Sequence, residues 1–154
     1  IRHALLESEK YFNQKFDFIV DLDATSPLRT IDDIINAFLQ FNKDESDNLI
    51  TGNPSQKNPY FNMVERINGK VQLVKKQNNY PTRRQDAPKV YDMNASIYIW
   101  KRQALLENDN LFKDKTSLYI MPKERSIDID NEFDWNLVNY LMRGSIDDWL
   151  HEKV

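Results

Sequence analysis

The sequence predicts one α/β domain of 154 residues with a mostly parallel sheet. A strand pattern at residues 16–22 is followed by a loop, a helix pattern from residue 30 to 41 and a strand at 48–52, which is the β-α-β order of parallel sheets. Hydrophobic residues make up 40% of the chain, enough to form a core. The pair Asn68-Gly69, between two short strand patterns, indicates a β-hairpin.

The elements follow from local patterns taken in order. Residues 1–14 have apolar side chains at helical spacing and predict a helix. Residues 16–22 are mostly apolar and predict a strand that is buried on both faces. Thr30 and Asp33 form a capping-box pattern that begins the next helix.

The second half of the chain predicts shorter elements. The hairpin strands are expected at 61–67 and 70–75, before a long irregular segment at 76–92. Beyond it we expect strands at 94–100 and 117–121, a helix at 102–107, an extended segment at 127–129, a helix from Glu132 to Met142 that ends near Gly144, and a last helical piece from Ser145.

Composition excludes several classes of protein. No apolar run approaches the ~20 residues that span a bilayer, so no membrane partner is expected. A net charge of −3 argues against nucleic-acid binding. The absence of cysteine excludes disulfides and thiolate metal sites and fits a cytoplasmic protein. Three glycines are too few for a Gly-rich phosphate loop, and the missing initiator Met suggests a fragment without its natural N-terminus.

The acid segment, residues 126–130, contains two carboxylates two positions apart. In an extended chain Ile127 and Ile129 point to one side, while Asp128 and Asp130 point to the other. Two carboxylates on one face repel each other unless a cation or a proton intervenes, and Mg²⁺ prefers such oxygen ligands. The alternative is a solvated strand end that caps the following helix.

The polar loop, residues 23–29, follows the first predicted strand. In parallel sheets, ligands bind outside the carboxyl ends of the strands, where this loop lies. Asp23 supplies a carboxylate, Thr25 and Ser26 supply hydroxyls, and Arg29 supplies a cation. An ordinary strand-to-helix turn with good capping chemistry would contain the same residues.

Two further segments offer ligand-binding groups. Arg83 and Arg84 are adjacent in residues 82–86, and their planar guanidinium groups suit a carboxylate or a triphosphate. A solvated basic turn is the alternative. Farther along, the small residues Ala95 and Ser96 leave room for a ligand beside a strand, whereas Tyr98 is expected on sequence alone to pack.

Four of these segments occur in the order and spacing of one family. The segments 25–29, 84–85, 94–99 and 126–132 resemble the acylneuraminate cytidylyltransferases, also called CMP-sialic acid synthetases, in a match covering about residues 16–142. Segments 58–62 and 87–94 look most like a bacterial flagellin-modification subgroup that activates legionaminic acid and related sugars.

The resemblance implies a Rossmann-like fold of the nucleotide-diphospho-sugar transferase type, with a hairpin insert at residues 58–86 through which two copies form a homodimer. It implies Mg²⁺-dependent transfer of CMP from CTP to the anomeric hydroxyl of a nine-carbon keto-sugar acid, with release of pyrophosphate. The family's N-terminal strand and CTP-binding loop have no counterpart here, so the 154-residue chain alone is expected to show no turnover.

The family's residue roles transfer by motif. Asp128 and Asp130 match the family's metal-binding acids, and Arg84 matches a family arginine that is expected to meet the sugar acid. These three are the expected catalytic residues. Asp23 stands where sialic-acid enzymes have Gln, and Phe61 or Asn62 stands where they have Lys, so a related sugar is favoured over N-acetylneuraminate. The expected substrate-binding residues are Asp23, Thr25, Ser26, Arg29, Asn94, Ser96 and Tyr98.

Two alternatives remain open. A CMP-Kdo synthetase shares the fold but has different motifs around the acids, so residues 126–132 argue against it. A non-catalytic binding or assembly module would keep the fold without needing Asp128, Asp130 and Arg84.

Overall fold

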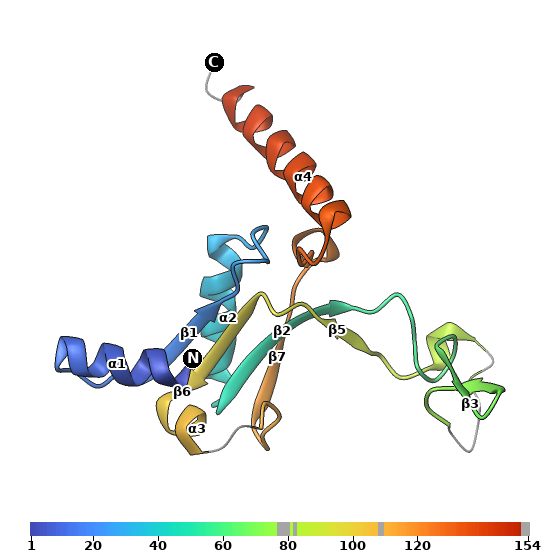
Figure 1. Ribbon diagram of the computed structural model, residues 1–154, viewed down its shortest axis with the longest axis horizontal. Helices are drawn as coiled ribbons and strands as arrows, with labels where there is room; N and C mark the ends of the chain where they lie inside the picture. Colours follow the sequence, from blue (N-terminus) through green and yellow to red (C-terminus); the bar gives the residue numbers. More distant parts are fainter. Residues whose placement is uncertain (77–80, 82, 108–109, 152–154) are drawn as a thin grey trace. The chain divides into compact units, whose positions relative to one another are not determined.

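The computed structural model describes residues 1–76, 81, 83–107 and 110–151, and it divides into two compact units. The first unit comprises Ile1–Asn53 and Met93–Val154, and the second comprises Pro54–Asp92. Figure 1 shows a sheet with its helices in the first unit and a small hairpin in the second. The insert expected at residues 58–86 falls within the second unit.

The sheet of the first unit is mixed. Strand β6 (Ile97–Lys101) lies between β1 (Phe18–Leu22) and β2 (Asn48–Pro54) and is antiparallel to both. Strand β7 (Thr116–Ile120) pairs parallel with β2. The strands β1, β2 and β7 therefore share one direction, and β6 runs against them. The α/β fold is confirmed, but a strand from later in the chain separates β1 from β2.

The strand expected at 94–100 is broken near its start. Strand β5 (Tyr91–Met93) also pairs with β2, but Ala95, between β5 and β6, has a φ of 49°. This left-handed conformation interrupts the extended backbone and costs a non-glycine residue roughly 1–2 kcal/mol. Asn94 and Ser96, on either side of Ala95, are buried.

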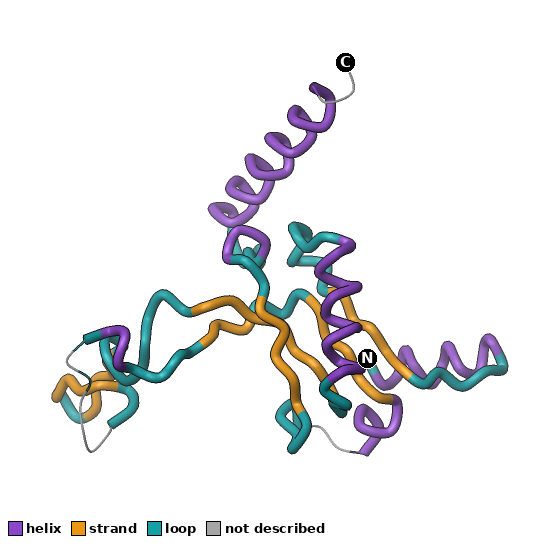
Figure 2. The backbone as a smooth tube through the Cα atoms, turned by 180° about the vertical axis from the view of Figure 1, so that it is seen from behind, coloured by secondary structure: helices purple, strands orange, loops and turns teal. Residues whose placement is uncertain are grey.

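One face of the sheet is covered by α2 (Ile31–Lys43), which Figure 2 shows running alongside the strands. The capping box predicted at its start is present: Thr30 accepts a hydrogen bond from the Asp33 backbone, and Asp33 accepts one from the Thr30 backbone. The buried core under this helix consists of Ala37, Phe41, Leu49, Ile97, Ile99 and Met121.

The opposite face packs against α1 (Arg2–Phe12) and α3 (Arg102–Glu107). Side chains alternate along β6, so Ile97 and Ile99 face α2, whereas Trp100 packs with Leu5 and Leu105 on the other side. The sheet is therefore the middle layer of three.

The prediction that β1 is buried on both faces is wrong. Phe18, Val20 and Leu22 are 42%, 41% and 39% exposed. Among the described residues β1 pairs only with β6, so its other edge presents unpaired backbone groups beside exposed apolar side chains. Such an edge is prone to pairing with another chain.

We expect Val20→Lys to reduce concentration-dependent self-association of the 154-residue chain, because a charge on an exposed strand edge opposes edge-to-edge pairing. Light scattering over a dilution series measures the effect. Ile35→Lys is the control, since Ile35 is an exposed apolar residue on α2 and lies on no strand edge. Equal changes in the two variants would mean that surface charge, and not the β1 edge, governs association.

The prediction of a helix that ends near Gly144, with a separate piece from Ser145, is also wrong. Helix α4 runs from Glu132 to His151 without interruption. A single glycine lowers helix propensity by about 1 kcal/mol, which does not by itself end a helix. In the described part of the chain no helix, α4 included, combines the length and apolar character needed to cross a bilayer.

The second unit confirms the predicted hairpin. Strands β3 (Val64–Ile67) and β4 (Lys70–Leu73) are antiparallel, with Ile67 opposite Lys70. Asn68 and Gly69 have φ values of 51° and 79°, as a tight two-residue hairpin turn requires. The unit also contains the 3₁₀ turn η1 (Arg84–Asp86).

Candidate functional site

Three segments of the first unit meet beyond the end of β1. They are the polar loop (residues 23–29), the start of β6 with the preceding Asn94, and the acid segment (residues 126–130). The Ile129 backbone N–H donates to the Thr25 carbonyl at 2.9 Å, and Ser26 Oγ donates to the Asn94 carbonyl at 3.3 Å. The structure therefore brings together segments that are more than 60 residues apart in the sequence.

The polar loop is organised by its own side chains. Asp23 Oδ1 accepts hydrogen bonds from the backbone N–H and the hydroxyl of Thr25, at 3.0 and 2.9 Å. These two bonds lower the pKa of Asp23 below its ordinary value, so the carboxylate is charged. Arg29 Nη1 donates to the carbonyls of Asp23 and Ser26, both at 2.6 Å. Arg29 therefore holds the backbone of the loop in place, and Asp23 gives the loop a half-buried negative charge.

Asn94 connects the sheet to the acid segment. Its Nδ2 donates to Ser126 Oγ at 2.9 Å, and its Oδ1 accepts from the Ser96 backbone N–H at 3.3 Å. Asn94, Ser96 and Ser26 are all buried, so this structure gives them a supporting position rather than an exposed contact surface. Ser96 Oγ is a buried hydroxyl with no hydrogen-bond partner in the described structure.

Tyr98 lies half-buried among three carboxylates. Burial raises the pKa of its phenol, and the negative charges of Asp23, Asp21 and Asp128 raise it further. Asp21 is directly opposite Tyr98 in the pairing of β1 with β6. The hydroxyl of Tyr98 therefore stays protonated and can donate a hydrogen bond beside a concentration of negative charge.

The two acids of the acid segment differ in environment. Asp128 is half-buried, and its Oδ1 is shielded from solvent without a partner among the described residues. Asp130 is exposed, and its backbone N–H donates to Asp134 Oδ2 at 3.2 Å. Ile127 and Ile129 are half-buried rather than fully buried.

An unpaired buried carboxylate oxygen is costly, and a cation is one group that would satisfy it. The described residues contain no cluster of three or more His, Cys, Asp or Glu that could hold a metal alone. Any cation at Asp128 would therefore complete its shell with water or substrate oxygens, which is how Mg²⁺ is commonly held.

Arg84 belongs to the second unit. Its Nη2 donates to the carbonyls of Ser55 and Gln56, at 3.3 and 3.0 Å, and its side chain is exposed. Thr82, at the start of the predicted basic segment, lies outside the described residues.

Sequence reasoning missed two features of the site. One is Asp21, which could have been found because it lies two positions before Asp23, a spacing that in an extended chain places both side chains on one side. The other is the ion pair of Arg125 with Asp33, whose Nε–Oδ2 and Nη2–Oδ1 distances are both 2.8 Å. Asp33 was recognised only as a helix cap, and no local pattern relates it to a residue 92 positions away.

Low pH should destabilise the fold through two carboxylates that form ion pairs, those of Asp33 and Glu9. Burial alone would raise the pKa of Asp33, but hydrogen bonds from Arg125 and Thr30 outweigh it and lower the pKa from 3.8 to about 2. The hydrogen bond from Arg102 lowers the pKa of Glu9 from 4.5 to about 2. Each charged form is favoured by folding, so its stabilisation is complete above the unfolded pKa and is lost as the pH falls through the folded pKa.

We therefore expect the free energy of unfolding to decrease as the pH is lowered from about 5 to about 2. Urea denaturation at a series of pH values measures it. The double variant Glu9→Gln, Asp33→Asn should start less stable and show a shallower decrease, because it lacks both titrating groups. Parallel curves for the two proteins would contradict this assignment.

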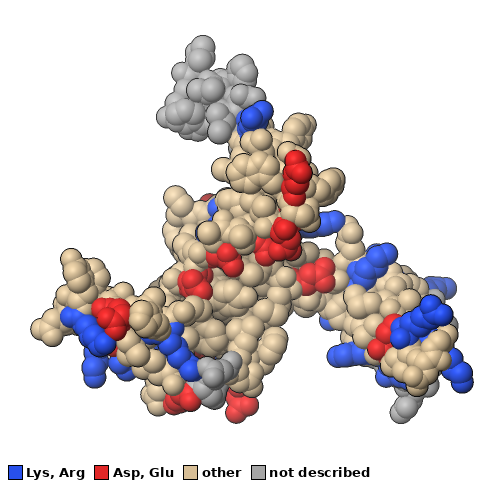
Figure 3. Space-filling view, viewed as in Figure 1, with Lys and Arg blue, Asp and Glu red and all other residues tan. Residues whose placement is uncertain are grey.

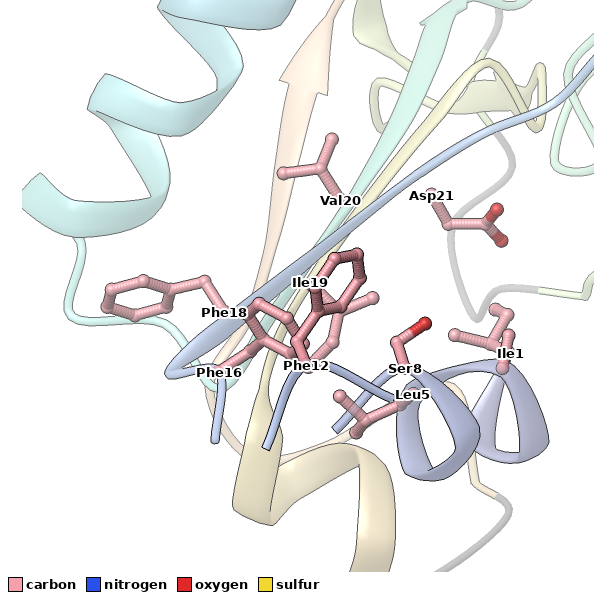
Figure 4. Close-up of a pocket in the computed structure, with 10 residues that line it drawn as sticks. Ile1, Leu5, Ser8, Phe12, Phe16, Phe18, Ile19, Val20 and Asp21 are labelled. Atoms are coloured by element: carbon pink, nitrogen blue, oxygen red, sulfur yellow. The ribbon is translucent and has the colours of Figure 1, made fainter. Parts of the chain in front are cut away.

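A separate apolar pocket lies between α1 and β1 (Figure 4). The pocket is lined on one side by Leu5 and Phe12 of α1 and by Ile1 just before that helix, and on the other side by Phe16 and Ile19. Asp21 is an acidic residue in its lining. Among the described residues that line this pocket, none belongs to the polar loop, the start of β6 or the acid segment.

Comparisons with known proteins agree with the motifs, although no family model matches the chain. Flagellin modification protein B of Campylobacter coli is 50% identical over 143 residues, which are 93% of this chain and 60% of that protein. A CMP-N,N'-diacetyllegionaminic acid synthase of Campylobacter jejuni is 49% identical over 142 residues, 92% of this chain and 60% of that protein. An N-acylneuraminate cytidylyltransferase of Streptococcus agalactiae is 31% identical over 124 residues, 80% of this chain and 29% of that protein.

The chain is therefore an α/β protein that is similar in sequence to cytidylyltransferases. The resemblance inferred from the motifs is confirmed, since the chain is homologous to the acylneuraminate cytidylyltransferases and to their legionaminic-acid relatives. The chain spans about 60% of the length of the first two of these relatives.

Proposed function

We propose that this chain contributes the sugar-acid and metal side of a CMP-nonulosonate synthetase. The reaction joins the anomeric oxygen of a nine-carbon keto-sugar acid, such as legionaminate, to the α-phosphorus of CTP. The bond from that phosphorus to the β-phosphate oxygen breaks, pyrophosphate leaves, and the hydroxyl proton passes to solvent. The observation that supports this best is the buried Oδ1 of Asp128, which has no hydrogen-bond partner among the described residues and lies near Asp23 and Tyr98, in a homologue of cytidylyltransferases.

Each group has a role that fits its environment. Asp128 and Asp130 would hold Mg²⁺, which when bound neutralises charge on the triphosphate. Tyr98 keeps its proton and donates to an oxygen of the sugar acid. Asp23 is charged and accepts from a hydroxyl or amide N–H of the sugar. Thr25, Ser26, Arg29, Asn94 and Ser96 hold these groups in place.

We also propose that the second unit has a basic surface suited to anionic groups and that it serves as the insert through which two copies form a homodimer. Residues 54–92 contain eight of the 21 Lys and Arg residues but only three of the 24 Asp and Glu residues. Figure 3 shows the predominance of Lys and Arg on this unit and a group of acidic side chains on the visible face of the first unit. Arg84 in this basic unit is suited to a carboxylate or a phosphate.

The test is an assay of the full-length protein with CTP, Mg²⁺ and a panel of nonulosonic acids. We expect a CMP-sugar and pyrophosphate with at least one diacetylated nonulosonic acid, and no product from the 154-residue chain alone. Product with Kdo only would favour a CMP-Kdo synthetase. No product with any sugar acid would favour a non-catalytic module.

A further inference from the structure

We propose that Asp33 and Arg125 form a clamp that positions the acid segment, residues 126–130, against the polar loop, residues 23–29. Both are positioning residues, since neither is placed on the substrate and both act on Asp128. The inference rests on the proposed function for its catalytic consequence, but its structural consequence can be measured without substrate.

The clamp joins the two ends of the site. Asp33 lies in the first turn of α2, directly after the polar loop, and it caps that helix through Thr30. Arg125 is the last residue of the 3₁₀ turn η2 (Lys123–Arg125), directly before the acid segment. The bidentate ion pair between them therefore fixes the start of the acid segment, at the end of η2, relative to the end of the polar loop, at the start of α2.

A second attachment completes the positioning. The Ile129 backbone N–H donates to the Thr25 carbonyl at 2.9 Å, so the acid segment is held on both sides of Asp128. Between these two points Asp128 is half-buried, and its Oδ1 has no hydrogen-bond partner in the part of the chain that the structure describes. Because Arg125 is three residues before Asp128, loss of the clamp would remove the only ion pair next to the segment in the described structure and leave it held by hydrogen bonds at Ser126, Ile127 and Ile129.

The carboxylate of Asp33 accepts four hydrogen bonds from Thr30 and Arg125. Its Oδ2 accepts from the Thr30 N–H and hydroxyl, both at 2.9 Å, and from Arg125 Nε, while its Oδ1 accepts from Arg125 Nη2. A helix cap needs only the Thr30 contacts. The two bonds from Arg125 go beyond what the cap needs. They join the Asp33 side chain, which is 1% exposed, to the residue before the acid segment, and this makes the pair a clamp.

The chain supplies a matched control. Arg102 binds Glu9 with the same geometry, at 2.7 and 2.9 Å, but that pair joins α3 to α1 and involves no residue of the site. Removing either arginine takes away a two-bond ion pair. Only the removal of Arg125 should change the order of the acid segment.

The experiment is native-state hydrogen exchange of the 154-residue chain, read at the Ile129 amide and referred to core amides of β6. Arg125→Gln and Asp33→Asn should lower the relative protection of Ile129 by about tenfold or more, the effect expected for losing hydrogen bonds to a charged group. Arg125→Lys, which keeps the charge but not the planar fork, should give an intermediate loss. Arg102→Gln should leave the relative protection unchanged.

Equal protection of Ile129 in wild type and in Arg125→Lys and Arg125→Gln would overturn the clamp, as would an equal loss in Arg102→Gln. In the full-length protein, Arg125→Lys should lower kcat several-fold with little change in the KM for the sugar acid. If exchange changes as expected but no CMP-sugar forms even in the wild type, the clamp stands and the proposed function fails.

Discussion

Asp128→Asn in the full-length protein is expected to lower kcat for CMP-sugar formation by at least about a hundredfold, the scale seen when one group that stabilises transition-state charge is removed. The amide has nearly the shape of the carboxylate, but it is neutral and has one acceptor oxygen instead of two. Because Oδ1 of Asp128 is buried without a partner in the described structure, its charge is the feature most available to a cation. Steady-state kinetics with CTP and the accepted sugar acid measure the loss.

Two further variants test whether the loss of kcat is specific to the acids of the acid segment. Asp130→Asn should also cut the rate far more than it weakens sugar binding, although Asp130 is exposed. Asp32→Asn removes an exposed acid from the first turn of α2 and should leave kcat within about twofold of wild type, as surface substitutions usually do. An unchanged kcat in Asp128→Asn would remove Asp128 from the mechanism.

Local signals in the sequence were sufficient for the elements that depend on neighbouring residues. Thr30 and Asp33 marked the start of α2, and Asn68-Gly69 marked the hairpin, because capping and tight turns are decided within a few residues. The place of β6 between β1 and β2 depends on pairing between segments some 80 residues apart, for which the sequence has no local signal. The exposure of β1 was also missed because it depends on distant pairing: an apolar strand has the same sequence pattern in the middle of a sheet and at its edge.

For the site, spacing identified candidate residues but could not distinguish ligand contacts from support. The acids and hydroxyls near Asp23, Asn94 and Asp128 do come together in the structure. Yet Asn94 is buried and occupied by Ser126, and Arg29 is occupied by loop carbonyls. Which partner a polar side chain satisfies depends on tertiary contacts, and a motif records only that the side chain is present.

Phe41→Ala is expected to lower the free energy of unfolding by about 3–5 kcal/mol, the usual cost of removing a buried aromatic side chain. Phe41 is 1% exposed and packs edge-to-face on Phe18, with 5.7 Å between ring centroids. It also stacks on Phe38 of the same helix, at 6.2 Å. Urea denaturation monitored by circular dichroism measures the loss.

Phe112→Ala is the matched control, because Phe112 is 59% exposed and the same truncation there should cost less than about 1 kcal/mol. Comparable losses in the two variants would show that α2 is not anchored through Phe41. The consequence reaches the site, since α2 begins with the Thr30 cap and with Asp33, which binds Arg125. If α2 packs less firmly on the sheet after loss of the Phe41 side chain, Asp33 at the start of α2 also positions Arg125 and the acid segment less firmly.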